Sequence, residues 1–259
     1  MNQVSELATI DRDGAVARLT LNRPDARNAL SLDLLAALRA RVAELAKTPD
    51  VTVCVIEGAG KAFCAGMDLR AVLDEPGAPE KLLSEIAELT LELRALPMTT
   101  VAKVRGGAIG GGCGLMCVCD ISITHPEAKI GFPEVDLGVC PAVVAPWLAL
   151  RVGHGQARRI LLEGGTMTGR RAAEIGLVST VVEEGELDTR AQALSERLAG
   201  AGPEALRATK TWLNKLESGP DGGDLAEMVR SGARLSASVV TSEEARTRLR
   251  QMFAGSGPR

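Results

Sequence analysis

Two glycine-rich segments are the parts of this sequence best suited to chemistry. They are "GAGKAFCAGMDL" at 58–69 and "GGAIGGGCG" at 106–114, and each follows an apolar run typical of a buried strand. A helix that begins just after such a segment leaves free backbone N–H groups at the positive end of its dipole. Glycine lets a substrate carbonyl approach this backbone closely. The pair predicts an oxyanion hole for an enolate, although glycines can also simply close a tight turn and let a helix pack.

Glu134 is the best single candidate for moving a proton. It lies in "IGFPEV" between Pro133 and an apolar run, where desolvation would raise the pKa of its carboxyl group. The sequence has only two histidines. We expect His125 to lie away from the glycine-rich segments and His154 to lie at the start of a helix, so neither is a predicted catalyst.

The six cysteines predict packing rather than chemistry. Cys64 and Cys113 flank the glycine-rich segments, but no partner base is visible that would activate either thiol. Cys113 and Cys117 are four residues apart, yet a zinc site would need histidines or a second cysteine pair at suitable spacing. We therefore predict buried free thiols and no metal.

Composition excludes several function classes. The 259 residues are 46% hydrophobic and 24% charged, as in a globular protein with a core. A net charge of −3, with two Trp, three Phe and no Tyr, argues against a nucleic-acid partner. Neither glycine-rich segment ends as a phosphate-binding loop does, and nothing marks the ribose-binding acid of a dinucleotide fold. Without a signal core or a membrane-spanning run, we expect a cytoplasmic protein and no membrane partner.

The elements that must position these residues alternate between strands and helices, which implies an α/β sheet layered with helices. The expected elements are strands at 4–10 and 15–22 joined at Asp13-Gly14, a helix capped by Ser31, a strand at 51–60, a helix over roughly 80–95, a strand at 99–107, a helix from about Gly111 and a strand at 120–125. From about 190 the chain is helical and Ala-rich, with a flexible break at 217–224. We predict a main domain over 1–195, and a helical region over 196–259 that serves assembly and covers the site.

Five motifs occur in the order seen in a known family. They are "LNRPDARNALS" (21–31), "GAGKAFCAGMDL" (58–69), "GGAIGGGCGLMCVCDISIT" (106–124), "IGFPEVDLGVCP" (130–141) and "TGRRAAEIGLVSTVV" (168–182). In these motifs the sequence resembles the enoyl-CoA hydratase/isomerase (crotonase) superfamily over almost its whole length. The resemblance implies a crotonase-like ββα spiral core with a C-terminal helical region. It also implies a homotrimer or a dimer of trimers.

The resemblance implies how an acyl-CoA substrate would bind. Members of the family hold the thioester carbonyl between two backbone N–H groups, which by motif position are those of Met67 and Gly111. Arg23, Arg27 and the "CAGMDL" loop would lie along the nucleotide and pantetheine, although Arg27 also suits a solvated surface position. The implied substrate-binding residues are Arg23, Arg27, Ala65, Gly66, Met67, Asp68, Leu69, Gly110, Gly111, Gly114, Pro133 and Pro141. No cofactor is implied beyond the coenzyme A of the substrate.

The acids depart from the family pattern. Hydratases of the family usually carry two glutamates, one after "GGGC" and one after "G-x-P". The second is present as Glu134, but Gly114 stands in place of the first. The expected function is an enoyl-CoA hydratase-like lyase that uses Glu134 alone. A Δ3,Δ2-enoyl-CoA isomerase with one glutamate, and a catalytically silent acyl-CoA-binding protein, are the alternatives.

A second departure follows "LGVCP", where the chain continues "AVVAPWLALRVG" (142–153). This run resembles a branch whose members act on branched or carboxylated enoyl-CoAs. Gly114 is expected to open space for a bulky acyl group. Arg94, Arg105 and Arg151 are candidates to pair with a distal carboxylate, although each also suits an ordinary surface position. The ending "RQMFAGSGPR" also differs from the family's usual one.

Overall fold

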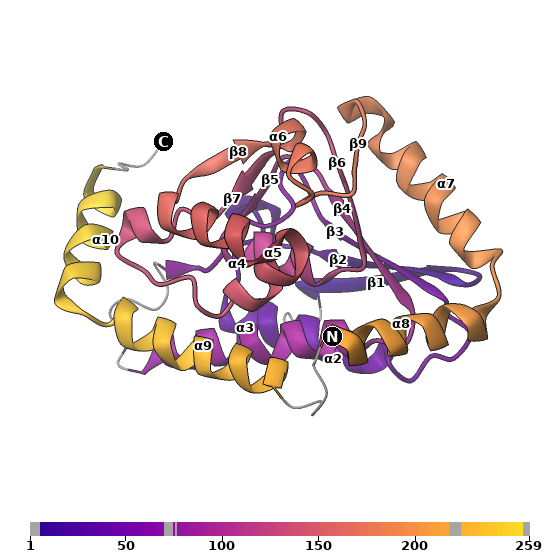
Figure 1. Cartoon of the computed structure of the whole chain (residues 1–259), viewed down its shortest axis with the longest axis horizontal. Coiled ribbons are helices and arrows are strands. Elements are labelled where there is room, and N and C mark those ends of the chain that lie inside the picture. Colours follow the sequence, from indigo (N-terminus) through magenta and orange to yellow (C-terminus); the bar gives the residue numbers. More distant parts are fainter. Residues whose placement is uncertain (1–5, 70–74, 76, 218–223, 256–259) are drawn as a thin grey trace.

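The computed structural model describes residues 6–69, 75, 77–217 and 224–255, which form two β-sheets packed among helices (Figure 1). The larger sheet has the strand order β1-β2-β3-β4-β6-β9. Its strands are β1 (Ala8–Asp13), β2 (Val16–Leu21), β3 (Val53–Gly58), β4 (Thr99–Val104), β6 (Ile121–Thr124) and β9 (Thr180–Val181). Only β1 runs antiparallel to its neighbour, and the remaining pairs are parallel.

The opening hairpin forms where the sequence predicts it. Asp13 pairs with Val16, and Gly14 in the turn between them has a φ of +55°, which favours glycine. The first strand begins at Ala8, later than predicted, and residues 4 and 5 of the predicted strand lie outside the described residues.

A second, three-stranded sheet has no counterpart among the predicted elements. It has the order β5-β7-β8, formed by β5 (Gly107–Ile109), β7 (Lys129–Gly131) and β8 (Thr166–Thr168). Each strand has three residues, too few for an alternating pattern to be visible in the sequence. A single bridge between Cys64 and Ala108 joins β5 to the chain that follows β3.

Helices cover both faces of the larger sheet. On one face α7 (Leu187–Ala199) packs Leu187 and Leu194 against Val53 and Val101. On the other face lie α2 (Leu32–Leu45), α3 (Ala78–Ala95) and α4 (Gly111–Val118). Helix α2 begins as predicted, because the Oγ of Ser31 accepts a hydrogen bond of 3.2 Å from the N–H of Leu34.

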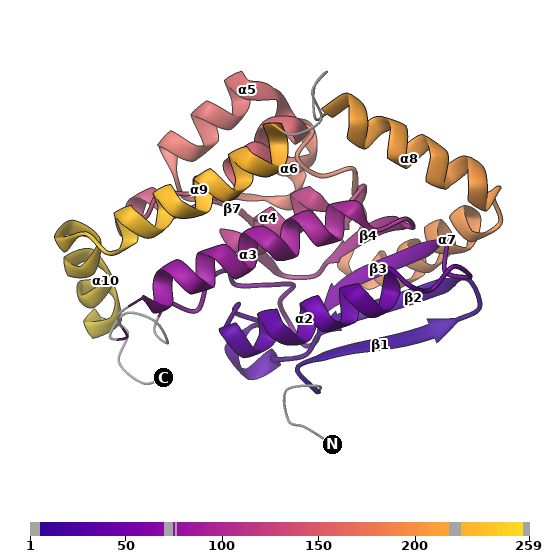
Figure 2. The ribbon, with the colours of Figure 1, turned by 90° about the horizontal axis from the view of Figure 1, so that it is seen from below.

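The remaining helices complete the C-terminal half. They are α5 (Ala145–Glu163), α6 (Gly169–Glu174), α8 (Pro203–Glu217), α9 (Asp224–Val240) and α10 (Glu243–Gly255), with short 3-10 turns η1 (Pro24–Ala26), η3 (Val135–Leu137) and η4 (Glu184–Glu186). Helices α2, α3 and α9 lie side by side (Figure 2). Helix α10 packs against η3. No helix in the described ranges is both long and apolar enough to cross a membrane.

Candidate active site

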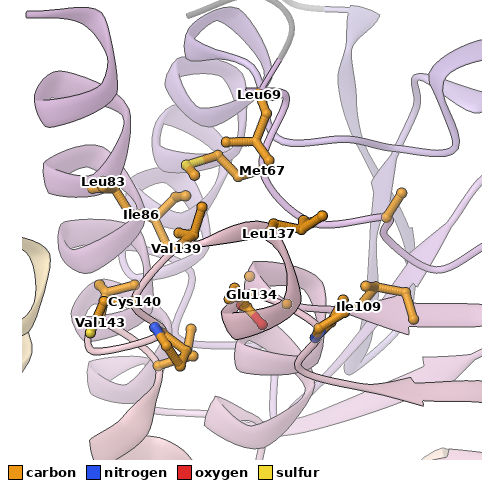
Figure 3. A pocket seen from close by; sticks show the side chains of 17 residues that line it. Met67, Leu69, Leu83, Ile86, Ile109, Glu134, Leu137, Val139, Cys140 and Val143 are labelled. Atoms are coloured by element: carbon orange, nitrogen blue, oxygen red, sulfur yellow. The ribbon is translucent and has the colours of Figure 1, made fainter. Parts of the chain in front are cut away.

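The glycine-rich segments meet at the carboxyl ends of two neighbouring parallel strands. One segment follows β3 and the other follows β4, so both chains leave the sheet at the same edge. A cavity of about 80 Å³ lies between them and the loop that carries Glu134 (Figure 3). The sequence-predicted residues that line it are Ala65, Gly66, Met67, Leu69, Gly110, Gly111, Pro133, Glu134 and Pro141.

Two residues of the cavity wall, Met67 and Gly111, have backbone N–H groups with no backbone partner among the described residues. Gly111 is the first residue of α4, where an N–H has no carbonyl four residues earlier in the helix. The N–H of Met67 donates to no carbonyl in the described part of the chain. A Cβ built on Gly111 would lie 3.9 Å from the Met67 nitrogen, so the two segments are in contact. Both donors therefore lie at the wall of the same cavity without a backbone acceptor in the described part of the chain.

Glu134 carries the charge of the cavity. Its residue is partly exposed, but its Oε2 atom is buried and has no hydrogen-bond partner among the described residues. Burial raises the pKa of the Glu134 carboxyl group to about 7, while a hydrogen bond from its own backbone N–H lowers it less. No other residue of the described lining carries a charge. At neutral pH this carboxyl group is poised both to accept and to donate a proton.

Gly110 makes room for that carboxylate. A Cβ at this position would lie 2.8 Å from Oε1 of Glu134, closer than real Cβ atoms approach an oxygen. Gly110 also has a φ of +54°, and its N–H donates a hydrogen bond of 2.8 Å to the carbonyl of Gly131. The glycine therefore serves both the turn into α4 and the position of the acid.

The rest of the wall is apolar, and sequence reasoning did not identify it. Helix α3 contributes Leu83 and Ile86, and the chain after Glu134 contributes most of the remainder. The lining residues that the sequence did not predict are Leu83, Ile86, Ile109, Leu137, Val139, Cys140, Val143 and Val144 (Figure 3). The apolar run "VCPAVVAPW" was the available signal for the last four.

The expectation that Gly114 opens space for a bulky acyl group is wrong. Gly114 is buried in α4 and does not line the cavity. A Cβ built on it would lie 2.4 Å from Cγ1 of Val144, so the valine side chain already occupies that space. Val144 is itself buried, at 1% exposure, and lines the cavity in place of Gly114.

Arg23, Arg27 and Asp68 lie outside the cavity lining. Arg23 donates a hydrogen bond of 2.6 Å to Oδ2 of Asp68 and another of 3.1 Å to the carbonyl of Ala29, so it ties the η1 loop to the Met67 loop. Arg27 is exposed, and its carbonyl accepts a hydrogen bond of 3.0 Å from Ala65.

The three arginines considered as partners for a distal carboxylate are engaged elsewhere, and none lines the cavity. Arg94 pairs with Asp120 and Glu217. Arg151 donates to the carbonyls that end α4, including that of Cys117 at 3.0 Å. Arg105 pairs with Asp188 at 2.9 Å near the start of α7.

The histidines are also placed by packing. His125 does not lie away from the glycine-rich segments, as expected, because its Nε2 accepts a hydrogen bond of 3.0 Å from the N–H of Gly106. His154 begins the second part of α5, after a break at Gly153, where φ is 77° and ψ is 156°.

The thiols beside the glycine-rich segments are unsuited to act as nucleophiles. Burial raises the pKa of the Cys64 thiol to about 12 and raises the pKa of Cys113 well above its ordinary value. No cluster of metal-ligating side chains occurs among the described residues.

Comparison with known proteins shows the family of the chain. The family model described as enoyl-CoA hydratase/isomerase matches residues 11–253. The "Probable enoyl-CoA hydratase echA8" of Mycobacterium bovis is 35% identical over 211 residues, which cover 81% of this chain and 82% of the relative. The 2,3-dehydroadipyl-CoA hydratase of Escherichia coli is 35% identical over 82% of this chain and 83% of its own.

Solved structures extend the match to the whole fold. Pseudomonas aeruginosa AtuE superposes with a TM-score of 0.79 at 34% identity and covers 98% of both chains. With a family model that spans nearly all of the sequence and this structural agreement, the chain has the crotonase fold and belongs to the enoyl-CoA hydratase/isomerase family.

Proposed function

We propose that this protein adds water reversibly to a 2-enoyl thioester of coenzyme A, as an enoyl-CoA hydratase with a single glutamate. The observation that carries the proposal is the position of Glu134. Its carboxyl group, with a pKa of about 7, shares one cavity with the Met67 and Gly111 amides, which make an oxyanion hole for the thioester. The catalytic groups are therefore Glu134 and these two N–H groups.

The reaction balances with one carboxylate. Glu134 takes a proton from water as the water oxygen bonds to the β-carbon of the enoyl group. The electron pair of the double bond moves toward the thioester and gives an enolate oxygen, which the two amides stabilise. Glu134 then returns its proton to the α-carbon. A pKa near 7 suits a group that must be both base and acid within one turnover.

The substrate would extend out of the cavity along the neighbouring loops. We assign Arg23, Arg27, Asp68 and the loop of Ala65 and Gly66 to the coenzyme A portion, with no further cofactor. Arg23 is held by Asp68, which fixes its guanidinium beside the Met67 loop. The apolar lining suits an apolar acyl group, branched or unbranched, better than a carboxylated one.

Assembly as a homotrimer or a dimer of trimers is part of the proposal. Helix α8 exposes Trp212 at 58%, Leu213 at 50% and Leu216 at 60%, a concentration of apolar surface that is typical of an interface. Light scattering on the purified protein tests this assembly, and a monomer would contradict it.

A second candidate is a Δ3,Δ2-enoyl-CoA isomerase. It is favoured by the absence of a second charged group from the described lining, because a 1,3-proton shift needs one carboxylate and no water. Glu134 would remove a proton from the α-carbon of a 3-enoyl thioester and return it to the γ-carbon. The double bond then moves into conjugation.

The test follows mass and absorbance with crotonyl-CoA, 3-methylcrotonyl-CoA, 3-methylglutaconyl-CoA and a 3-enoyl-CoA, with Glu134→Gln as the control. For the hydratase, the product should gain the mass of one water, and the rate of this hydration should fall ~100-fold or more in the variant. Conversion of the 3-enoyl thioester without hydration would replace it with the isomerase. Binding without turnover of any substrate would mean a catalytically silent acyl-CoA-binding protein.

A further inference from the structure

The two departures from the family pattern touch each other. Gly114 lies in α4, and Val144 lies thirty residues later in the "AVVAPW" run. A Cβ built on Gly114 would lie 2.4 Å from Cγ1 and 3.2 Å from Cβ of Val144. Even an alanine at 114 requires the valine to move. The glycine and the valine are therefore the two complementary sides of one contact.

Val144 is held in that place by its own segment. Its N–H donates a hydrogen bond of 3.3 Å to the carbonyl of Pro141, and its carbonyl accepts one of 3.1 Å from Leu148 in α5. These bonds hold the backbone of Val144, and its side chain is packed at 1% exposure, so a Cβ at 114 would have to displace packed atoms.

Helix α9 supports the same segment from behind. The Oγ of Ser236 accepts hydrogen bonds of 3.1 and 3.3 Å from the N–H groups of Ala142 and Val143, and it donates one of 2.6 Å to the carbonyl of Cys140. Gly232 lets the helix approach, since a Cβ there would lie 2.3 Å from the carbonyl oxygen of Ala142. Helix α9 thus fixes the segment that carries Val144.

We propose that Val144 is a specificity-determining residue of this site. The side chain of Val144 occupies the space that a side chain at 114 would need. A methyl surface therefore lies where a glutamate at 114, and the water bound to it, would otherwise lie. The site is then confined to chemistry through Glu134 and prefers acyl groups with an apolar branch against this wall. The inference rests on the proposed function, but its steric part can be tested without any activity.

A double-mutant cycle tests the contact. Gly114→Ala should lower the thermal midpoint by ~3 °C or more, because the new Cβ meets Val144. Combined with Val144→Ala, which removes Cγ1 but leaves Cβ 3.2 Å away, the same substitution should cost clearly less than it does in the wild type. Val144→Thr keeps the branched shape, so in that background the cost should persist. Gly155→Ala, on an exposed helical glycine with no atom within 4 Å, controls for the helix propensity of alanine.

An equal cost of Gly114→Ala in the wild-type and Val144→Ala backgrounds would overturn the contact. A cost that disappears in the threonine background as well would show that shape is not the cause. Either result removes the physical basis of the proposal.

Activity tests the consequence. In Gly114→Glu/Val144→Ala, the ratio of kcat/KM for crotonyl-CoA to kcat/KM for 3-methylcrotonyl-CoA should rise ~10-fold or more, because a second carboxylate can now hold water. Gly114→Glu alone should lose stability and show no such rise. A folded double variant that binds crotonyl-CoA and keeps the wild-type ratio would overturn the role in specificity.

Failure of the proposed function is distinguishable from failure of this inference. If the wild type hydrates neither thioester, the hydratase assignment fails. The role of Val144 is then tested by measuring the affinity for each thioester by calorimetry instead of the rate of hydration. The role of Val144 in specificity is supported if the wild type binds 3-methylcrotonyl-CoA more tightly than crotonyl-CoA and the Val144→Ala variant does not. An unchanged preference would contradict it.

Discussion

The Oε1 atom of Glu134 lies against Gly110, 2.8 Å from the point at which a Cβ of that residue would stand. The residue that opens the turn into α4 therefore also sets the place of the acid. Gly111, the next residue, carries one of the two amides that we propose as donors. The same turn of backbone therefore sets the positions of the Glu134 carboxylate and of the Gly111 amide.

Gly110→Ala should reduce kcat by roughly 10-fold or more, because a displacement of the carboxylate by a fraction of an ångström moves it away from the reacting carbons. The affinity for acyl-CoA should change much less. The matched control is Gly176→Ala, which has a similar positive φ of +77° but no atom within 4 Å of its Cβ. Both variants should also lose stability through backbone strain, because an L-residue rarely adopts a positive φ. An equal loss of kcat in the two would exclude the contact with Glu134 as the cause.

The pH dependence of activity should follow Glu134. Hydration begins with the carboxylate as base, so kcat/KM should rise with pH through about 7, where the pKa of Glu134 lies. Glu134→Asp keeps a carboxyl group, so its kcat/KM should be lower but should still rise with pH. Rates of hydration measured from pH 5 to pH 9 provide the check. A flat profile across this range in the wild type would contradict the role of Glu134 as the base.

The free energy of unfolding should also depend on pH through Glu134, but it should fall as the pH rises. The pKa of Glu134 is raised from 4.5 to about 7 on folding, so between these values the folded protein holds a proton that the unfolded chain has released. Stability is therefore lost as the pH rises through this window, by about 3 kcal/mol in total. Glu134→Gln lacks this loss. Its unfolding free energy, relative to that of the wild type, should increase by that amount from pH 4.5 to pH 8, and a constant difference would contradict the raised pKa.

Asp120 anchors α8 to the sheet and should be important for stability. It accepts hydrogen bonds of 2.8 Å from the buried Lys210 and 2.7 Å from the N–H of Thr100, and it pairs with Arg94. Asp120→Ala would leave Lys210 buried without a carboxylate and should cost about 3–5 kcal/mol in urea unfolding. Glu227→Ala, which breaks an exposed pair, should change stability little. A small effect of both substitutions would show that Asp120 does not hold α8.

Elements with a clear local signal were predictable from the sequence. Ser31 caps α2 as expected, α3 spans Ala78–Ala95 and ends before Pro97, and α4 begins at Gly111. Each has a capping residue, a proline or a glycine-rich segment at its boundary. The helical C-terminal region was also expected, although its predicted break and the last four residues lie largely outside the described residues.

The small sheet and the apolar wall could not be predicted because both depend on contacts between distant segments. Three-residue strands show no period, and β7 pairs with β8 across more than thirty residues. Gly114 was the misleading residue. A glycine in place of a larger side chain suggests empty space, but whether a neighbour fills it depends on Val144, which only the folded chain brings close.

The contact between Gly114 and Val144 also restricts the order in which this site could evolve. A glutamate that appeared at 114 while Val144 was still present would bring its Cβ 2.4 Å from Cγ1 of the valine, so that intermediate should lose stability. A smaller residue at 144 would remove the closest contact before the acid appears, and in the reverse direction loss of the acid would make room for the valine. The order of single substitutions that avoids this loss passes through a protein with neither the glutamate nor the valine.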